Sequence, residues 1–375
     1  MNKRINTLLL FCIIMMILSF GCSKISKKSS TISESSTSSS SVVVSTSSEL
    51  IVSSSIVPHS EQVTPISPLV SPTTGKSYST DKMFYPIMVT IENASGARPQ
   101  TGLNKTDIIY EFPVESTITR FLCIYNDTLP TVVGPVRSAR YYFYYTQKEW
   151  DSIYVHFGGA GEEDSISIYN KKYNWTKVDI DGMLGKYGSY FWRDNSRKAP
   201  HNAYTDLVSI KTKYPDYKSN RDYFCSFSDS PSFSDISAKK IHIPFASTKK
   251  PNVEFVYDET TKLYTRYENG IVFKSVETND EGKTTQEVVT TRNVIVQYVP
   301  METIHTTHYN RRKINMIGSG DAEFFINGKY IHGKWERKGE DDYTLYYDDF
   351  GKEIVLGVGS TWIAIQPDWY NVTFS

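Results

Sequence analysis

Charged and polar side chains crowd into residues 98–202, where they could carry proton transfer or bind an anion. Glu111, Asp194 and His201 are side-chain types that act as general acid or base in hydrolytic reactions, so they are the catalytic candidates. A second set could hold a ligand by charge and hydrogen bonds: Glu115, Arg120, Arg137, Ser138, Arg140, His156, Arg197 and Asn202. We expect both sets to line one polar cleft.

The sequence around Glu115 predicts a β-hairpin with a two-residue turn at Ser116 and Thr117. In that register Glu111, Glu115 and Arg120 share one face of the hairpin, with Arg120 diagonal to both glutamates. The glutamates are then ~13 Å apart, too far for the carboxylate pair of a glycosidase. The triplet is either a solvated ion-pair cluster or the floor of a binding site.

Residues 134–140 read Gly-Pro-Val-Arg-Ser-Ala-Arg and predict a turn that enters a helix. Ser138 is the expected N-cap, which places Arg137 and Arg140 beside the unpaired amides of the first turn. This arrangement would bind a carboxylate or a phosphate. The alternative is that both arginines pair with acids of the same fold, Glu111 and Glu115 included.

His156 ends a predicted strand before a glycine-rich loop and is either a site residue or a structural one. That loop lacks the lysine of a phosphate loop, which argues against nucleotide binding. Further along, His201 near a carboxylate could act as acid or base. Alternatively, Asn202 caps the next helix and Asp194 pairs locally with Arg197.

The surrounding pattern predicts an α+β fold, with a mixed α/β domain at 78–236 and a β-rich antiparallel domain at 237–375. The first domain has strand-like segments at Tyr85–Asn93, Asp107–Glu115, Ile118–Asn126 and Ser152–Phe157. It has helix-like segments at Ala139–Trp150, Glu162–Lys172 and Ala203–Tyr214. The second domain alternates short strands with turn signals such as Asn269-Gly270 and Asn327-Gly328.

The N-terminus predicts export and anchoring. Residues 1–22 combine a basic start with an apolar run too short for a membrane span, which is typical of a signal peptide. They end at Cys22, which resembles the lipidated cysteine of bacterial lipoproteins. Residues 23–77 are rich in Ser, Thr and Val and predict a disordered tether. The expected location is the outer face of the cytoplasmic membrane.

The composition indicates which classes of partner and cofactor are not expected. The 41 basic and 41 acidic residues cancel, so nothing favours nucleic acid. Apart from Cys12 and Cys22, the cysteines are Cys123 and Cys225, which either pair or stay as free thiols. No zinc-type spacing is present, and His305 with His308 lacks a third ligand, so we expect no metal and no cofactor.

Several motifs together resemble the YerB-like bacterial lipoproteins. They are RPQTGLNKTDIIYEFPVESTITRF, GPVRSAR, HFGG, and WRD followed by RKAPHNAY, with NGK, GKW and GSTWIAIQP closing the chain. Ser116-Thr117 stands where the resemblance implies glycines. The resemblance implies an envelope lipoprotein of two parts, in a family defined more firmly by sequence than by function.

Two functional classes remain open. In the first, the protein binds or remodels cell-wall glycan or peptidoglycan, and any enzyme activity would be that of a peptidoglycan hydrolase or lytic transglycosylase. In the second, it is a non-catalytic envelope lipoprotein that binds a partner protein or a small anionic ligand.

Overall fold

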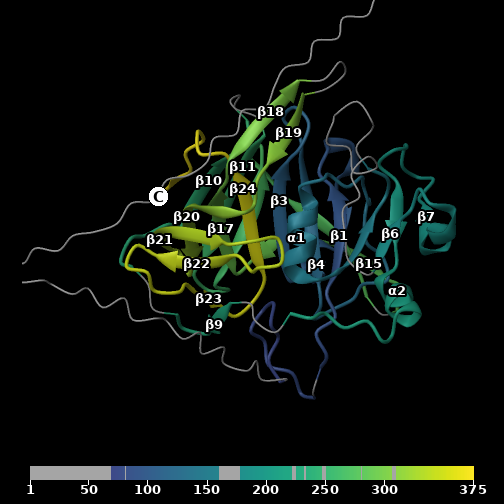
Figure 1. Ribbon diagram of the computed structural model, residues 1–375, viewed down its shortest axis with the longest axis horizontal. Coiled ribbons are helices and arrows are strands. Elements are labelled where there is room, and N and C mark those ends of the chain that lie inside the picture. Colours follow the sequence, from purple (N-terminus) through teal and green to yellow (C-terminus); the bar gives the residue numbers. More distant parts are fainter. Residues whose placement is uncertain are drawn as a thin grey trace, which may run out of the picture. The chain divides into compact units, whose positions relative to one another are not determined.

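A ten-stranded sheet runs through the protein and takes strands from both halves of the sequence (Figure 1). The computed structural model describes residues 69–80, 82–159, 178–221, 225–231, 234–246, 251–279, 281–305 and 310–375. The expected signal peptide, Cys22 and the tether up to residue 68 lie outside the described residues.

The strands of the large sheet follow one another in space in an order that differs from their order in the chain. That order is β22 (Leu345–Asp348), β21 (Lys329–Arg337), β20 (Gly318–Ile326), β17 (Asn293–Tyr298), β24 (Thr361–Gln366), β3 (Ile108–Pro113), β4 (Thr119–Tyr125), β1 (Ile87–Glu92), β5 (Ile153–His156) and β6 (Asp179–Asp181). The halves meet where β24 pairs with β3 in parallel, with Thr361 opposite Ile108.

Smaller sheets surround this one. A six-stranded sheet contains β13 (Ile271–Val272), β12 (Leu263–Glu268), β11 (Asn252–Asp258), β10 (Lys240–Pro244) and β25 (Thr373–Phe374), with β16 (Thr290–Thr291) paired to β12. A three-stranded sheet contains β15 (Thr284–Val288), β14 (Lys274–Thr278) and β2 (Gln100–Thr101). The pairs are β18 (Met301–His305) with β19 (Asn310–Ile314), β23 (Val355–Gly357) with β9 (Ser226–Ser228), and β7 (Phe191–Arg193) with β8 (Ala203–Thr205).

Helices are few and short in the described residues. The α-helices are α1 (Phe143–Trp150) and α2 (Leu207–Lys213). The 3-10 helices are η1 (Ser95–Ala97), η2 (Leu103–Lys105) and η3 (Gly185–Tyr190).

Each face of the large sheet has its own core. On one face, Phe121 packs edge-on against Phe273 and Trp362, next to the six-stranded sheet. On the other, Phe112 packs against Phe143 of α1. Cys123 belongs to the first core and Cys225 packs against the second, and both are free thiols.

The expected α+β class is wrong, because the described residues form a mostly β protein and the first half is not a mixed α/β domain. The helix expected from Ala139 begins only at Phe143. The one expected at Ala203–Tyr214 starts instead as strand β8, which pairs with β7 before α2 begins. Tertiary pairing overrides local propensity there. The third expected helix, Glu162–Lys172, lies outside the described residues.

Part of the segment expected to belong to the tether is tied to the folded body. Hydroxyl groups of Ser71 and Thr74 donate to the Asp127 carboxylate, with Ser71 at 2.6 Å and Thr74 at 2.5 Å. Thr73 donates to Asp107, whose burial raises its pKa to about 7. Residues 71–74 therefore form an ordered turn that closes one end of β3 and β4.

Candidate functional site

Two groups of charged side chains lie at the same end of β1, β3 and β4, on opposite faces of the large sheet. Glu92 of β1 is directly opposite Arg120 of β4, so these two share one face. Glu111 of β3 is opposite Phe121, the next residue of β4, and belongs to the other face. Successive side chains of a strand point to opposite faces of the sheet. Arg120 and Phe121 are neighbours on β4, so the groups beside them lie on opposite faces of the sheet.

The expected hairpin register is wrong by one residue. The ladder ends with Pro113 opposite Thr119, whereas a two-residue turn would have put Pro113 opposite Arg120. The chain closes instead with Val114 and Ile118 bonded to each other and Ser116 at a φ of 53°. A one-residue shift moves a side chain to the other face, which separates Arg120 from Glu111.

The first group, which we call the arginine cluster, consists of Glu92, Glu115, Arg120, Arg137 and Arg140. The Gly134–Arg140 segment supplies two of its arginines by running along β1. The amide of Arg137 donates to the carbonyl of Thr90, and Val136 bridges to Ile91. Gly134 permits this path, because a Cβ there would lie 2.7 Å from the ring of Tyr204.

Glu115 links two of the arginines. Nε of Arg140 donates to Oε1 of Glu115 at 2.7 Å, and a second nitrogen of the same guanidinium contacts the same oxygen. Nη2 of Arg120 lies 3.6 Å from Oε2 of Glu115, and its Nη1 donates to the carbonyl of Ser138 at 2.9 Å. Arg140 therefore holds Glu115 more tightly than Arg120 does.

Glu92 links the third arginine to a histidine. Its Oε2 lies 2.6 Å from Nε of Arg137 and 2.9 Å from Nδ1 of His201. The Glu92 side chain is almost fully buried, whereas those of Arg137 and His201 are 22% and 27% exposed. The catalytic candidate His201 thus lies beside the arginine cluster, in contact with its member Glu92.

Positive charge exceeds negative charge within the arginine cluster, since three guanidinium groups face two carboxylates. Arg120 shows the consequence, because burial and the neighbouring Arg140 lower its pKa to about 9. Its Nε has no hydrogen-bond partner among the described residues. Burial alone would raise the pKa of Glu115, but the charges of Arg140 and Arg120 lower it. The cluster is therefore suited to accept one more negative charge.

Two expected helix caps are wrong. Ser138 is not the N-cap of α1, because that helix begins at Phe143 and has no side-chain cap; the Ser138 carbonyl accepts from Arg120 instead. Asn202 is not the cap of α2, since Asp206 accepts from the amides of the first turn.

His156 belongs to a separate group at the neighbouring strand ends. Its Nε2 lies 2.9 Å from Oδ1 of Asp179, and its Nδ1 lies 2.7 Å from the carbonyl of Gly158. Burial would lower the pKa of His156, yet Asp179 and Asp181 raise it. These contacts give His156 a structural part in joining β5 to β6.

The loop before β8 keeps Asp194, Arg197 and Asn202 occupied with each other and with the backbone. Asp194 accepts from the amide of Ser196 at 2.8 Å, and hydrogen bonds from the side chain and the amide of Ser196 lower the pKa of Asp194. Arg197 donates to the carbonyls of Ala97 and Pro99, so it does not pair with Asp194 as expected. The catalytic candidates Glu111, Asp194 and His201 are thus not brought together.

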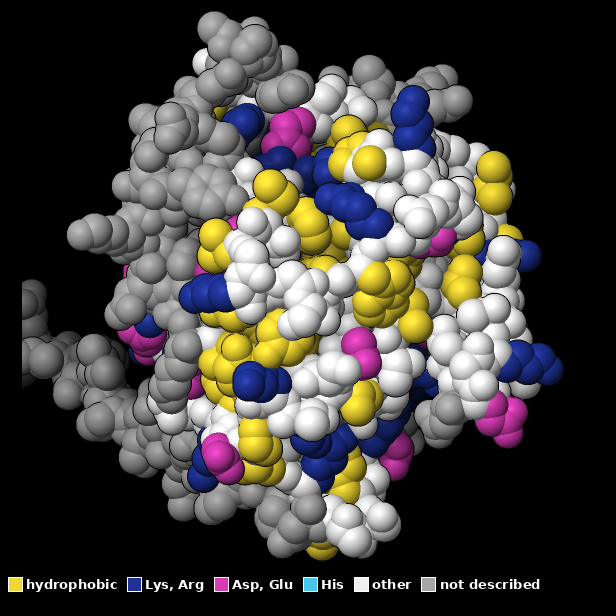
Figure 2. Space-filling view, turned by 90° about the vertical axis from the view of Figure 1, so that its right-hand side faces the viewer, with side chains coloured by type: hydrophobic (Ala, Val, Ile, Leu, Met, Phe, Trp, Pro, Cys, Tyr) yellow, Lys and Arg dark blue, Asp and Glu magenta, His cyan; other side chains and the backbone are white. Residues whose placement is uncertain are grey.

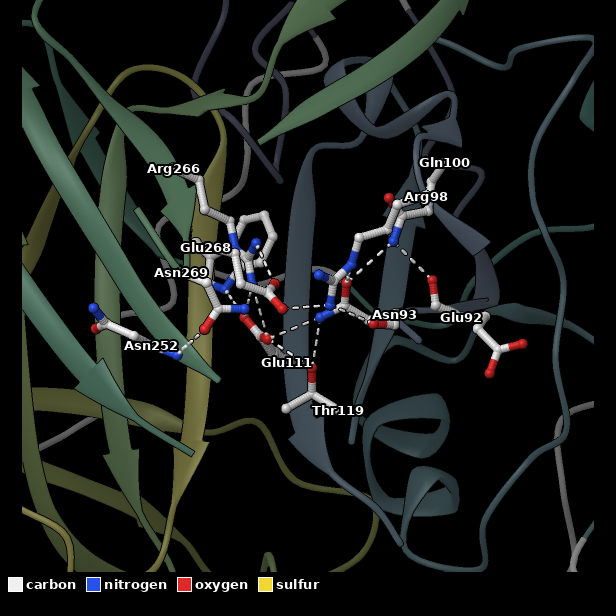
Figure 3. A network of polar contacts seen from close by, with 11 residues as sticks. Glu92, Asn93, Arg98, Gln100, Glu111, Thr119, Asn252, Arg266, Glu268 and Asn269 are labelled. Atoms are coloured by element: carbon white, nitrogen blue, oxygen red, sulfur yellow. Dashed lines mark hydrogen bonds and ion pairs between the residues drawn. The ribbon is translucent and has the colours of Figure 1, made fainter. Parts of the chain in front are cut away.

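The second group, which we call the buried network, is an alternating chain of charges formed by Glu111, Arg266, Glu268 and Arg98 (Figure 3). Nη2 of Arg266 lies 3.1 Å from Glu111, and its Nη1 lies 3.0 Å from Glu268. Arg98 pairs with the other oxygen of Glu268. Its guanidinium also donates to the carbonyl of Asn93 at 2.6 Å.

Neutral side chains complete the buried network. Thr119 donates to Glu111 at 2.7 Å and the indole of Trp362 donates to it at 3.1 Å. The guanidinium of Arg266 stacks 4.1 Å from the ring of Phe273. Both Glu111 and Arg266 are fully buried, and burial raises the pKa of Glu111 although Arg266 opposes the shift. Glu111 therefore lacks the access to substrate that a catalytic acid needs.

A cleft of about 200 Å³ opens beside the buried network, between loops of both halves of the sequence. Its lining includes Asn93, Arg98, Thr119, Glu268 and Asn269. Arg98 is the member of the network that reaches solvent, with 26% of its side chain exposed. The network thus ends at a small polar opening.

Several residues of the two groups were not anticipated as site residues: Glu92, Arg98, Arg266, Glu268 and Trp362. On β12, side chains alternate between the two faces, and the structure shows that Arg266 and Glu268 fall on the buried face with Tyr264. Charged residues at interior positions of an alternating strand indicate a buried ion pair. Which carboxylate of the first half would meet them depends on tertiary structure.

Comparison with known proteins finds a matching family for both halves of the chain. Residues 73–220 match the family model described as "Protein of unknown function (DUF3048) N-terminal domain", and residues 241–363 match the corresponding C-terminal domain. The chain is 32% identical over 293 residues to the Bacillus subtilis (strain 168) protein named "Putative lipoprotein YerB", which covers 76% of this chain and 81% of that one. The crystal structure of Bacillus subtilis YerB matches with a TM-score of 0.67 at 30% identity, over 82% of this chain and 99% of the other.

The chain belongs to the family of YerB-like bacterial lipoproteins. Membership supports a lipoprotein anchored in the cell envelope, while the family description names no activity. Among the described residues, no helix combines the length and apolar character needed to cross a membrane.

Proposed function

We propose that the protein is a membrane-anchored lipoprotein, attached through Cys22 at the outer face of the cytoplasmic membrane, that binds carboxylate groups of peptidoglycan without cleaving it. The observation that carries this proposal is the excess of guanidinium groups in the arginine cluster. A ligand carboxylate would balance the third arginine and supply a partner for Nε of Arg120.

Access to the arginine cluster supports binding at this place. Arg137 and His201 are 22% and 27% exposed, and Glu115 is 17% exposed. Arg120 lies behind them at 5%. A carboxylate could meet the exposed arginine first and then the buried one, and hydrogen bonds between charged groups are each worth about 1.5–3 kcal/mol.

Binding is favoured over cleavage because the acid–base candidates are separated. Glu111 lies in the buried network on the other face, and Asp194 is held in a turn by Ser196. A peptidoglycan hydrolase or lytic transglycosylase needs a positioned acid that reaches the glycosidic bond. His201 remains beside the arginine cluster, but its hydrogen bond to Glu92 suits a positioning part.

Calorimetric titration of the full chain with soluble muropeptides would test the proposal. Muropeptides with free carboxyl groups should bind, and their amidated counterparts should bind at least about tenfold more weakly, since one lost charged hydrogen bond costs about 1.5 kcal/mol or more. Arg137→Gln should weaken binding similarly. The matched control is Lys240→Gln, which removes an exposed cation paired with Glu254 on β11 and should leave binding unchanged.

Three outcomes would overturn the proposal. Equal binding of amidated and free muropeptides would remove the carboxylate from recognition. Binding only to wall preparations that retain phosphate polymers would assign the arginine cluster to phosphate. Release of glycan fragments by the unmodified protein would make it an enzyme.

A further inference from the structure

Hydrophobic side chains protrude from residues 183–193, which we call the aromatic tip. Met183, Leu184 and Trp192 are 63%, 44% and 41% exposed. They flank η3, whose Tyr187 and Tyr190 rings lie 6.3 Å apart. Figure 2 views the side of the protein that carries β7 and α2, where hydrophobic and basic side chains lie interspersed.

The backbone holds the aromatic tip in this outward conformation. The amide of Met183 donates to Oδ1 of Asp181 at 2.9 Å, and the amide of Leu184 donates to the Asp181 carbonyl at 3.0 Å. Gly182 allows the turn to lie against Phe157, since a Cβ there would come within 2.4 Å of that ring. Met183 and Leu184 are thus presented by an ordered turn at the end of β6, and Trp192 by strand β7.

Basic side chains surround the aromatic tip. Lys186 lies over the ring of Tyr187 at 4.6 Å, and Arg193 lies over Phe157 at 4.8 Å. Lys198 follows in the exposed loop after β7. Within residues 183–198 the acidic residue is Asp194, although the whole chain has a net charge of zero. This segment therefore carries more positive than negative charge.

We propose that the aromatic tip docks on the anionic phospholipid surface of the membrane that anchors the protein. Exposed aliphatic residues beside Trp, Tyr and basic residues match the composition that partitions into a membrane interface. Lys186 and Arg193 complement lipid phosphates, and each basic residue near such a surface adds to the attraction. Residues 23–68 can span at most about 165 Å, so an anchor at Cys22 keeps the bilayer within reach of the folded part. The anchor alone does not determine which surface of the folded part meets the bilayer.

Hydrogen exchange on the mature full chain, bound to vesicles, would test the docking. On vesicles of phosphatidylglycerol and phosphatidylcholine, the amides of residues 183–193 should exchange several-fold more slowly than in the vesicle-free protein. The double variant Met183→Ser/Leu184→Ser should lose this protection while remaining anchored. The matched control is Phe350→Ser, which removes a 96% exposed apolar side chain from the turn after β22 and should keep the protection.

Changing the lipid composition of the vesicles tests the part played by the basic residues. Protection should weaken on phosphatidylcholine alone and at high salt, because the basic residues then lose their partners. Unchanged exchange at residues 183–193 on anionic vesicles would overturn the proposal. Protection produced by peptidoglycan without vesicles would overturn it in favour of a glycan-binding surface.

Discussion

The arginine cluster and the buried network contain the same residue types and lie at the same end of β1, β3 and β4, yet their environments differ. The buried network alternates two arginines with two glutamates, and Glu111 and Arg266 have no solvent exposure. The arginine cluster sets three arginines against two glutamates and is partly open to solvent. We expect the balanced charges around the fully buried Glu111 and Arg266 to serve stability, and the excess charge of the arginine cluster to serve the proposed binding.

The number of polar residues in a stretch of sequence does not distinguish a structural network from a binding site. A buried pair must satisfy each charge internally, because an unpaired charge in the interior is costly. In a ligand-binding site, some charged groups of the protein find their partners only when the ligand is bound. Nε of Arg120 and Nε of Arg266 both lack a hydrogen-bond partner among the described residues, so the contrast lies in the neighbouring charges. Arg266 is shared by two carboxylates, whereas Arg120 has the like charge of Arg140 beside it and lies 3.6 Å from Glu115.

The largest expected effect tests the structural part of this comparison. Arg266→Met leaves Glu111 and Glu268 buried without their shared partner, so the free energy of unfolding should fall by about 3–5 kcal/mol. Chemical denaturation measures it. Lys313→Met, in an exposed pair with Glu302, is the control and should change stability little.

A loss below about 1 kcal/mol for Arg266→Met would contradict a structural role for the network, since broken buried pairs cost more than this. If this variant does not fold, Glu111→Gln combined with Arg266→Met provides the test. The double variant should be more stable than Arg266→Met alone, because position 111 then carries no buried negative charge that needs a cation.

Arg120→Met should give the reverse pattern. Glu115 keeps Arg140 and a crowded cation is removed, so the free energy of unfolding should change by less than about 1 kcal/mol. Carboxylate binding should weaken at least about tenfold, which titration with muropeptides measures. A stability loss as large as that of Arg266→Met would show that the arginine cluster is also a structural network.

Glu111 and Glu115 should make contributions to stability that change with pH in opposite directions. The pKa of Glu111 lies above its ordinary value of 4.5, so its contribution to stability falls as pH rises through the pKa of the folded state. The pKa of Glu115 lies below 4.5, so its contribution is complete above that value and is lost as pH falls through the folded pKa.

Denaturation from about pH 3 to about pH 8 would separate these contributions, each limited to a slope of about 1.4 kcal/mol per pH unit. The unmodified protein should lose stability as pH rises above 4.5, and Glu111→Gln should remove this loss. It should also lose stability as pH falls below 4.5, and Glu115→Gln should remove that loss. Plots for both variants that run parallel to that of the unmodified protein would contradict the assigned directions.

His201→Gln should have the smallest effect. The histidine is partly exposed and Glu92 retains Arg137, so stability should change by less than about 1 kcal/mol. Digestion of purified peptidoglycan should be absent for both the unmodified protein and the variant. Asp194→Asn serves as a matched control in the same assay. Digestion that disappears with His201→Gln alone would restore a catalytic role for this residue.

Local patterns in the sequence located strands but not their partners. The apolar segments around β1, β3, β4 and β5 were expected as strands and are strands. The register of the β3–β4 hairpin was not predictable from turn residues alone, because Val114 and Ile118 close a longer loop. Helix signals near Ala203 failed because pairing with β7 decided the local structure.

For the candidate site, the sequence supplied the residue types and the tertiary structure supplied the partners. Arg137, Arg140 and Glu115 were recognisable as charged groups that could meet, because they lie within a short stretch of chain. Arg266 and Trp362 could not be assigned to Glu111 in this way, since their contacts span 155 and 251 residues. Only the parallel pairing of β24 with β3 and the packing of the six-stranded sheet bring them together.

The sequence by itself determined the family and a central stretch rich in arginines and carboxylates, and it predicts a signal peptide that ends at Cys22. These properties depend on composition and short-range order, which the chain carries without folding. The tertiary structure decided that one continuous sheet joins both halves and that its two faces divide the charges. A face is assigned by register, and a single residue of shift exchanges buried and accessible side chains.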